Sequence, residues 1–277
     1  MTTLIRLAVV AVLAYTASCS WLYLGQDALL YYPTPESTRT DAVALRLSHD
    51  EETLKVWKAG GGEAAVIYFG GNAEDVGFNI PSFTRDIPDA THYFVNYRGY
   101  GGSTGSPEEA ANYRDAAYVF DYVSERHEQV SVIGRSLGSG IAVWLAAERP
   151  VARLVLITPF DSIEAVARNA YPWVPVSLLL KDKYRAVDRV PEVDAPVLIL
   201  VAEADSIIPQ ERSVALARAF DESQACLQVI RNAGHNTIGR SRDYLRLIGD
   251  FLAQVAPTHA ASARPGSWQC AARDSVS

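Results

Sequence analysis

The sequence predicts an α/β fold with a mainly parallel central sheet, helices on both faces and a short lid insertion. Segments alternate as strand, helix and strand from Ala64 to Val255, which is typical of such a sheet. The run Pro196 to Ala202 is apolar throughout, as expected for a strand whose two faces are both covered by helices. A domain of this size usually buries one core, so we assign residues 26–257 to a single globular domain.

The first residues predict a membrane anchor or an export signal over residues 1–25. Leu7 to Leu24 carries no charge and would extend about 27 Å as a helix, close to a hydrocarbon thickness of about 30 Å. An uncleaved helix anchor, a lipoprotein signal cut before Cys19, a secretory signal and a buried core helix all fit this pattern. The first three export the domain. Arg6 before the segment and Asp27 after it favour a domain facing outside, which is periplasmic or extracytoplasmic in a bacterium.

The next elements follow from hydrophobic periodicity and turn residues. Asp41 to Leu47 and Thr53 to Lys58 alternate in polarity and predict an antiparallel hairpin. Ala64 to Phe69 predicts a buried strand, which ends in a glycine-rich loop. Ser106 to Glu109 places a cap residue, a proline and an acidic residue before a helix that runs to about residue 126. Residues 258–277, rich in Ala and Ser, predict a disordered tail.

A nucleophile elbow is indicated around Ser136. This serine is the centre of the sequence G-R-S-L-G from Gly134 to Gly138, directly after the apolar run Val130 to Ile133 and before a helix-like stretch, Ile141 to Glu148. Small flanking residues allow a strained turn to lift a hydroxyl clear of the sheet. The motif alone is weak, so the assignment depends on the partners that a serine nucleophile requires.

The general base is assigned to His235. It follows the strand-like segment Ala225 to Arg231, in a loop with glycine and asparagines that suit an exposed turn before the last helix. A base at this position could accept the proton of the Ser136 hydroxyl. The other histidines are placed in a polar loop, in a strand, at a helix end before the elbow and in the tail: His49, His92, His127 and His259.

The acid that orients this base is assigned to Asp205. It lies on the loop after the strand Pro196 to Ala202, between the serine and the histidine in chain order. Its carboxylate would fix the histidine tautomer and stabilise the imidazolium. Glu203 is nearer the strand and is the alternative; we expect it to cap the strand end.

Two backbone N–H groups are expected to form an oxyanion hole. One belongs to Leu137, the residue after the nucleophile, at a helix N-terminus. The second is placed at Asn72, with Ala73 as the near alternative, because Gly70 and Gly71 open a loop that permits close backbone approach.

With these residues in place, the chain resembles the α/β-hydrolase superfamily, and within it the membrane-anchored hydrolases related to the eukaryotic abhydrolase-domain proteins. The resemblance spans about Gln26 to Val255. It is carried by the elbow together with Leu29 to Pro33, Tyr68 to Asn72, Asn96 to Ser103, Pro159-Phe160, Ala195 to Ile199 and Asp205 to Pro209. In such families the matching positions are nucleophile Ser136, acid Asp205 and base His235. Gly70 departs from the family pattern, which usually has histidine there, and this puts the rigidity of the loop in question.

The resemblance implies hydrolysis of esters or thioesters, including lysophospholipase and protein-depalmitoylase activities. We expect cleavage of medium or long acyl chains through an acyl-Ser136 intermediate. An acyltransferase or peptidase on the same triad, and a catalytically silent protein that binds lipid or a partner, are the alternatives. The insertion between Thr158 and Asp194 would either roof an apolar acyl pocket beside the membrane or pack as a helix pair on the sheet.

Charge and cysteine content limit the other classes of function. The net charge of −7, without a Lys/Arg cluster, argues against nucleic-acid binding. No metal-binding signature is present, and we expect no cofactor. Cys226 and Cys270 would be able to pair in an exported protein, although Cys270 lies in the predicted tail.

Overall fold

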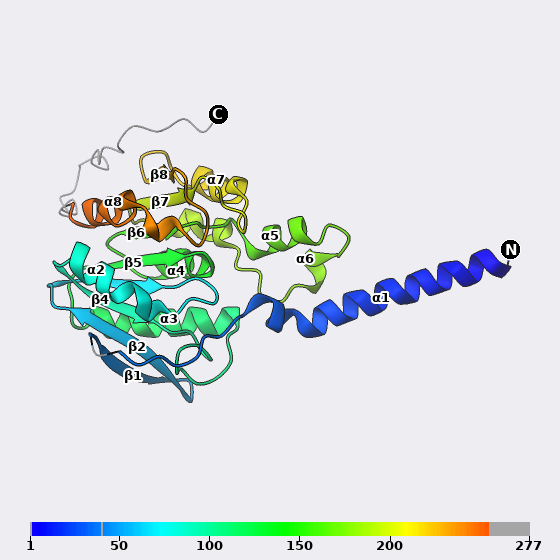
Figure 1. Ribbon diagram of the computed structural model, residues 1–277, viewed down its shortest axis with the longest axis horizontal. Coiled ribbons are helices and arrows are strands. Elements are labelled where there is room, and N and C mark those ends of the chain that lie inside the picture. Colours follow the sequence, from blue (N-terminus) through cyan, green and yellow to red (C-terminus); the bar gives the residue numbers. More distant parts are fainter. Residues whose placement is uncertain (1, 40, 255–277) are drawn as a thin grey trace.

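The computed structural model describes residues 2–39 and 41–254, and its centre is one sheet of eight strands (Figure 1). Helices cover both faces of the sheet, so the predicted α/β fold is confirmed. The strand order is β1-β2-β4-β3-β5-β6-β7-β8. The strands are β1 (Val43–His49), β2 (Glu52–Gly60), β3 (Ala64–Phe69), β4 (Ala90–Val95), β5 (Val130–Arg135), β6 (Leu154–Ile157), β7 (Val197–Ala202) and β8 (Ala225–Ile230).

Strand direction changes only at one side of the sheet. β1 pairs with β2 and β2 with β4 in antiparallel register, which confirms the predicted hairpin. All the other neighbouring strands run parallel. The chain goes from β3 to β4 on one side and then returns to add β5 on the other. This switch point brings the loops after β3 and β5 together at the carboxyl edge, where open α/β sheets usually bind ligands.

The helices divide into two layers and one projecting element. They are α1 (Thr2–Leu30), α2 (Ile80–Asp86), α3 (Glu109–Ser124), α4 (Leu137–Glu148), α5 (Ile163–Ala170), α6 (Val176–Leu179), α7 (Gln210–Ala219) and α8 (Arg242–Leu252), with short 3-10 helices η1 (Val76–Asn79), η2 (Ala186–Glu192) and η3 (Ile238–Arg240). Side chains of α3, α4 and α7 pack in one buried cluster, and those of α2 and α8 pack in another on the opposite face.

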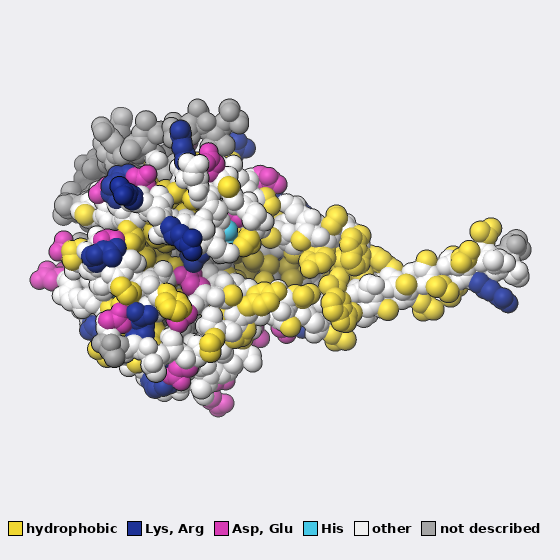
Figure 2. Space-filling model, in the orientation of Figure 1, with side chains coloured by type: hydrophobic (Ala, Val, Ile, Leu, Met, Phe, Trp, Pro, Cys, Tyr) yellow, Lys and Arg dark blue, Asp and Glu magenta, His cyan; other side chains and the backbone are white. Residues whose placement is uncertain are grey.

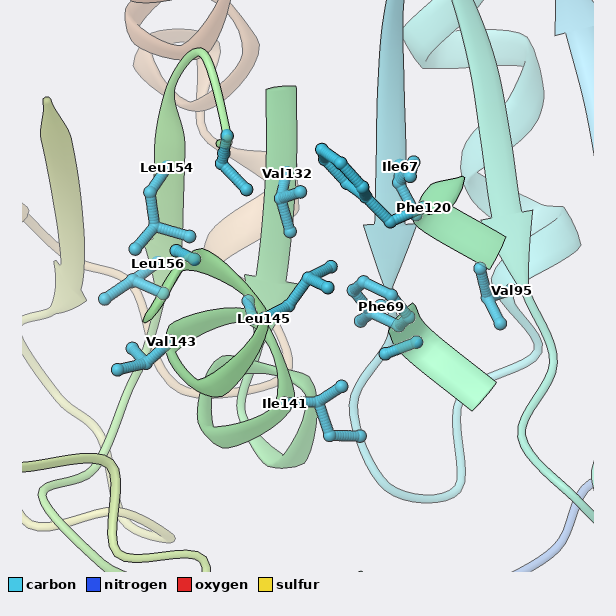
Figure 3. Packing of buried hydrophobic residues seen from close by; sticks show 14 of the residues in the cluster. Ile67, Phe69, Val95, Phe120, Val132, Ile141, Val143, Leu145, Leu154 and Leu156 are labelled. Atoms are coloured by element: carbon cyan, nitrogen blue, oxygen red, sulfur yellow. The ribbon is translucent and has the colours of Figure 1, made fainter. Parts of the chain in front are cut away.

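The two clusters are separated by the sheet itself, because successive strand residues point to opposite faces. In β5, Val132 belongs to the α4 cluster and Ile133 to the α8 cluster. Figure 3 shows the first cluster, with Ile141 and Leu145 of α4 beside strand residues such as Val132. These side chains are fully buried. The central strands are therefore apolar on both faces, as the sequence predicted.

α3 begins later than the sequence predicted, and Glu109 has a different role. The cap residue is Glu108, whose side chain makes no capping bond, and the helix ends at Ser124. The carboxylate of Glu109 does not close a capping box. It accepts the backbone N–H groups of Lys183 (2.6 Å) and Tyr184 (3.0 Å). A long-range contact that holds the lid insertion thus replaces the local one.

α1 extends away from the domain as a single helix (Figure 1). It continues to Leu30, past the predicted boundary at residue 25. It is long and apolar enough to cross a membrane, with a mean hydropathy of 1.8 in its most apolar window, none of which is buried. The alternative of a buried core helix is therefore wrong. The predicted tail, with His259 and Cys270, lies outside the described residues, so the cysteine pairing stays a prediction.

The lid insertion, residues 158–194, lies between β6 and β7 and contains α5, α6 and η2. Ile163 and Val166 of α5 pack against the core. The following turn and α6 extend toward α1 (Figure 1), and the Tyr15 hydroxyl of α1 donates to the carbonyl of Trp173 at 3.1 Å. The insertion thus joins the sheet to the projecting helix.

Gly134→Ala should destabilise the domain by about 1–3 kcal/mol, because an overpacked core side chain forces its neighbours to move. A Cβ at this position would lie 2.5 Å from the Cβ of Ala142. Gly249→Ala in α8 is the matched control. Its nearest neighbour would be 3.7 Å away, and alanine favours the helix by up to about 1 kcal/mol. In thermal unfolding, the melting temperature of Gly249→Ala should lie above that of the wild type, and that of Gly134→Ala below it. Equal melting temperatures for the two variants would contradict the packing argument.

Candidate active site

Ser136 occupies a strained turn between β5 and α4. Its φ of 49° and ψ of −115° lie in a region that L-residues rarely adopt. Its backbone N–H donates to the carbonyl of Ile157 at 2.9 Å, which ties the turn to β6. A Cβ at Gly138 would clash with the carbonyl of Phe69, so only glycine allows α4 to approach β3 this closely. The turn has the local structure that the sequence predicted for an elbow.

His235 lies beside the serine hydroxyl on the loop after β8. Its Nε2 is 3.0 Å from the Oγ of Ser136. The side chain is buried, and the loop is closed by a hydrogen bond from the Gly234 N–H to the Thr237 hydroxyl at 2.9 Å. The structure thus brings together two residues that are far apart in the sequence, in a geometry that suits proton transfer.

Asp205 lies on the other side of the same imidazole ring. Its Oδ2 is 2.8 Å from His235 Nδ1, while Oδ1 accepts the N–H groups of Ile207 (2.9 Å) and Ile208 (2.8 Å). Burial by itself raises the pKa of this carboxyl. The hydrogen bond and charge of His235 and the two backbone bonds outweigh burial, so the pKa lies below its usual value. Asp205 is thus held as a carboxylate aimed at the ring.

The alternative acid, Glu203, faces elsewhere. Its Oε2 accepts the backbone N–H of Asn232 at 2.7 Å, so it joins the end of β7 to the turn after β8. The other histidines that the structure describes, His49, His92 and His127, also have separate partners. His49 ends β1 rather than lying in a loop, and its ring bonds Asp115 and stacks on Tyr118.

The two expected oxyanion donors lie at the ends of neighbouring parallel strands. Within the part of the chain that the structure describes, the N–H groups of Leu137 and Asn72 have no hydrogen-bond acceptor. The N–H of Ala73, the alternative donor, is directed to the Asn72 side chain at 3.1 Å. The N–H of Gly71 is held by Glu74 at 2.5 Å. Asn72 is therefore the available donor of this loop.

Glu74 fixes the loop after β3, and sequence reasoning missed it. Its carboxylate accepts hydrogen bonds from the Tyr68 hydroxyl at 2.9 Å and the Asn79 amide at 2.7 Å, and pairs with Arg135 at 3.0 Å. Burial alone would lower the pKa of Arg135, but the charge and hydrogen bond of Glu74, together with the nearby Tyr68 and Tyr244, outweigh burial and raise it. Arg135 also donates to the carbonyl of His235 at 3.2 Å. One buried ion pair thus connects the loops that carry Asn72, Ser136 and His235.

Gly70 leaves no room for the histidine usual at this position of the family. A Cβ at residue 70 would lie 2.5 Å from Cγ1 of Val76. The carbonyl of Gly70 instead accepts the Tyr97 hydroxyl at 2.6 Å and the Gly138 N–H at 3.2 Å. Other groups therefore fix the loop, so it is held in place without the histidine that is usual at residue 70. The aromatic segment Asn96 to Ser103 was the only signal in the sequence for this support.

The side chain of Asn72 has four partners. Its Oδ1 accepts the Tyr100 hydroxyl at 2.7 Å and the Tyr32 N–H at 2.9 Å, in addition to its neighbour Ala73. Its Nδ2 donates to the carbonyl of Leu30, the last residue of α1, at 2.6 Å. The side chain thus holds the loop against the end of α1.

A cleft of about 590 Å³ lies beside Ser136 and His235. Its other walls are mainly polar or charged, with Glu36, Glu74, Asp75, Asn79, Arg135 and Asn236. Phe78, on its rim, is the large apolar side chain of the wall. Among the residues that the structure describes, no group of three His, Cys, Asp or Glu side chains is arranged to hold a metal ion.

Comparisons with known proteins agree with this fold. Residues 64–191 match the family model described as the alpha/beta hydrolase fold. An uncharacterized protein of Mycobacterium tuberculosis is 32% identical over 275 residues, which cover 90% of this chain and 96% of that protein. Lysophosphatidylserine lipase ABHD12 of Macaca fascicularis is 27% identical over 71% of this chain and 57% of its own length.

Among solved structures, the esterase Pf2001 of Pyrococcus furiosus superposes with a TM-score of 0.66. It covers 80% of this chain and 98% of that one at 14% identity, which supports the fold alone. The resemblance to abhydrolase-domain proteins is confirmed by the relatives in sequence. This chain therefore belongs to the α/β-hydrolase superfamily.

Proposed function

We propose that this protein is a membrane-tethered serine hydrolase that cleaves carboxylic esters or thioesters of medium or long acyl chains. The observation that carries the proposal is the continuous hydrogen-bonded chain from Ser136 Oγ through His235 to Asp205, with contacts of 3.0 and 2.8 Å. The sequence relative described as a lysophosphatidylserine lipase supports ester chemistry.

The proposed reaction uses these groups in sequence. Ser136 Oγ attacks the acyl carbonyl while His235 Nε2 takes its proton, and Asp205 stabilises the imidazolium. The negative oxygen of the tetrahedral intermediate accepts the N–H groups of Leu137 and Asn72. His235 then protonates the leaving alcohol or thiol, which departs as the acyl-Ser136 ester forms. Water, deprotonated by His235, attacks this ester and releases the carboxylic acid and the free Ser136 hydroxyl.

The proposed tether is α1, with the domain on the outer side of the membrane. Support comes from the exposed, uncharged run from Leu7 to Leu24 and from Arg6 at its start. Figure 2 shows hydrophobic side chains along α1 that the domain does not cover. Exposed apolar surface of this extent is typical of a membrane contact.

Ser136→Ala should lower kcat/KM for nitrophenyl esters by about 10³-fold or more, because the nucleophile is lost. The same change should abolish labelling by a fluorophosphonate probe. An unchanged thermal unfolding temperature is the control for folding. If the variant kept a third of the wild-type activity, Ser136 would not be the nucleophile.

Asp205→Asn should lower turnover far more than Glu203→Gln, because loss of the carboxylate favours the wrong histidine tautomer. The two changes are matched, since each replaces an acid by its amide on the same loop. Steady-state kinetics on one ester measures both. The opposite ranking would assign the acid to Glu203.

The full-length protein should sediment with membranes and remain there in high salt. Burial of apolar side chains is insensitive to the screening that releases electrostatically bound proteins. Mass spectrometry of the mature N-terminus separates the cases: Met1 or Thr2 indicates an uncleaved helix, and an acylated Cys19 indicates a lipoprotein. A soluble, uncleaved chain would contradict both forms of tether.

A further inference from the structure

An apolar groove lies between α1 and the lid insertion, apart from the cleft at Ser136. It has a volume of about 140 Å³. One wall carries Leu22, Leu29 and Leu30 of α1, and the other carries Ile163 and Ala167 of α5 and Leu179 of α6. Figure 2 shows hydrophobic side chains gathered at this junction, around a hollow in the surface. The groove therefore has the apolar lining that a hydrocarbon chain requires.

Specific hydrogen bonds hold the two walls together. Gln26 of α1 is buried, and its side chain accepts the Lys181 N–H at 2.8 Å and donates to the carbonyl of Leu179 at 3.3 Å. Nearer the N-terminus, the hydroxyl of Tyr15 donates to the carbonyl of Trp173. Both oxygen and nitrogen of the Gln26 amide are thus used in holding the lid insertion, and the groove keeps an apolar interior.

The groove and the Ser136 cleft are connected by one hydrogen bond between their lining residues. Leu30 lines the groove, and its carbonyl accepts the side-chain amide of Asn72. Asn72 in turn lines the cleft together with Ser136 and His235. The loop that carries the Asn72 N–H therefore lies between the groove and the cleft.

The chemistry of the two spaces is complementary. The cleft is lined mainly by charged and amide side chains, including Glu74 and Asp75, which suit the polar part of an ester. The groove offers carbon surface and one amide already bonded within the protein. It also lies at the end of the uncharged run of α1, so a chain that leaves a bilayer along this helix meets the groove first.

We propose that this groove binds the acyl chain of the substrate, with the anchor helix itself as one wall and α5 and α6 as the other. The proposal rests on the proposed ester hydrolysis for the identity of the ligand. It assigns to α1 a second role, in substrate recognition. The carbonyl to be attacked lies at the junction with Asn72, and the leaving group occupies the polar cleft.

The first test fills the groove in the full-length protein, reconstituted in phosphatidylcholine vesicles. Ala167→Trp should lower the ratio of kcat/KM for nitrophenyl decanoate over nitrophenyl acetate by about tenfold or more, since a few lost methylene contacts have effects of this size. Ala170→Trp is the matched control: it makes the same change on the same helix, at an exposed residue outside the groove. Its ratio should equal that of the wild type. An unchanged ratio in Ala167→Trp would overturn the proposal.

The second test does not depend on catalysis. Ser136→Ala protein in the same vesicles is irradiated with a photoactivatable palmitate, and the labelled peptides are mapped. Label should concentrate on residues 22–30 and 163–180. Unlabelled palmitate should compete with the probe, and adding Ala167→Trp to the Ser136→Ala protein should lower the amount of label several-fold. Uniform label along α1 that palmitate does not displace would indicate contact with bilayer lipid only, and would overturn the proposal. If wild-type protein hydrolyses no ester while the groove is labelled specifically, the proposed function fails and the acyl site stands.

Discussion

The candidate site depends on one steric constraint, the close approach of α4 to β3 and β5 around Ser136. Glycine at 134 and 138 permits this approach, since a side chain at either position would clash with its neighbours. The left-handed conformation of Ser136 has a cost of order 1–3 kcal/mol. Bonds from the turn to Ile157 and Gly70 offset this strain. Because the turn is fixed, the hydroxyl meets His235 at 3.0 Å.

A buried ion pair holds the loops around that turn. The pair between Glu74 and Arg135 would be weak support for stability by itself, because desolvation offsets much of the attraction. Its contribution at this site is to fix the positions of the loops. Glu74 orders the loop after β3 through Gly71, and Arg135 reaches the carbonyl of His235. Removal of either partner would leave a buried charge and release two of the loops that form the site.

Buried strands and the elbow could be predicted from the sequence because their signals are local. β3 has the predicted bounds, Ala64–Phe69, since a strand covered on both faces requires an uninterrupted apolar run. Ser136 and Asp205 follow such strands and His235 follows the edge strand β8, so their place at the carboxyl edge follows from topology. The role of Glu109 could not be predicted, because the backbone N–H groups that donate to it, those of Lys183 and Tyr184, lie far along the chain.

The same limit applies to Glu74 and Asn72. No local pattern distinguishes Glu74 from an ordinary polar residue of a glycine-rich turn. The contact of Asn72 with Leu30 joins two segments that the sequence treats as separate domains, an anchor and a hydrolase. Only the folded arrangement shows that the boundary between them, expected at residue 25, lies inside a continuous helix.

Hydrogen bonds fix the junction between α1 and the rest of the domain. Tyr31 bonds Asp182 at 2.7 Å and Tyr184 at 2.8 Å, and the N–H of the next residue, Tyr32, bonds Asn72. A flexible linker of about 20 residues would let a tethered domain sample about 25 Å, whereas here the helix passes into the fold directly. With α1 in a bilayer, Ser136 is therefore held at one height and one angle above the lipid. For the proposed hydrolysis, the consequence is that only those bonds that a substrate presents at this distance from the bilayer come within reach of the Ser136 hydroxyl.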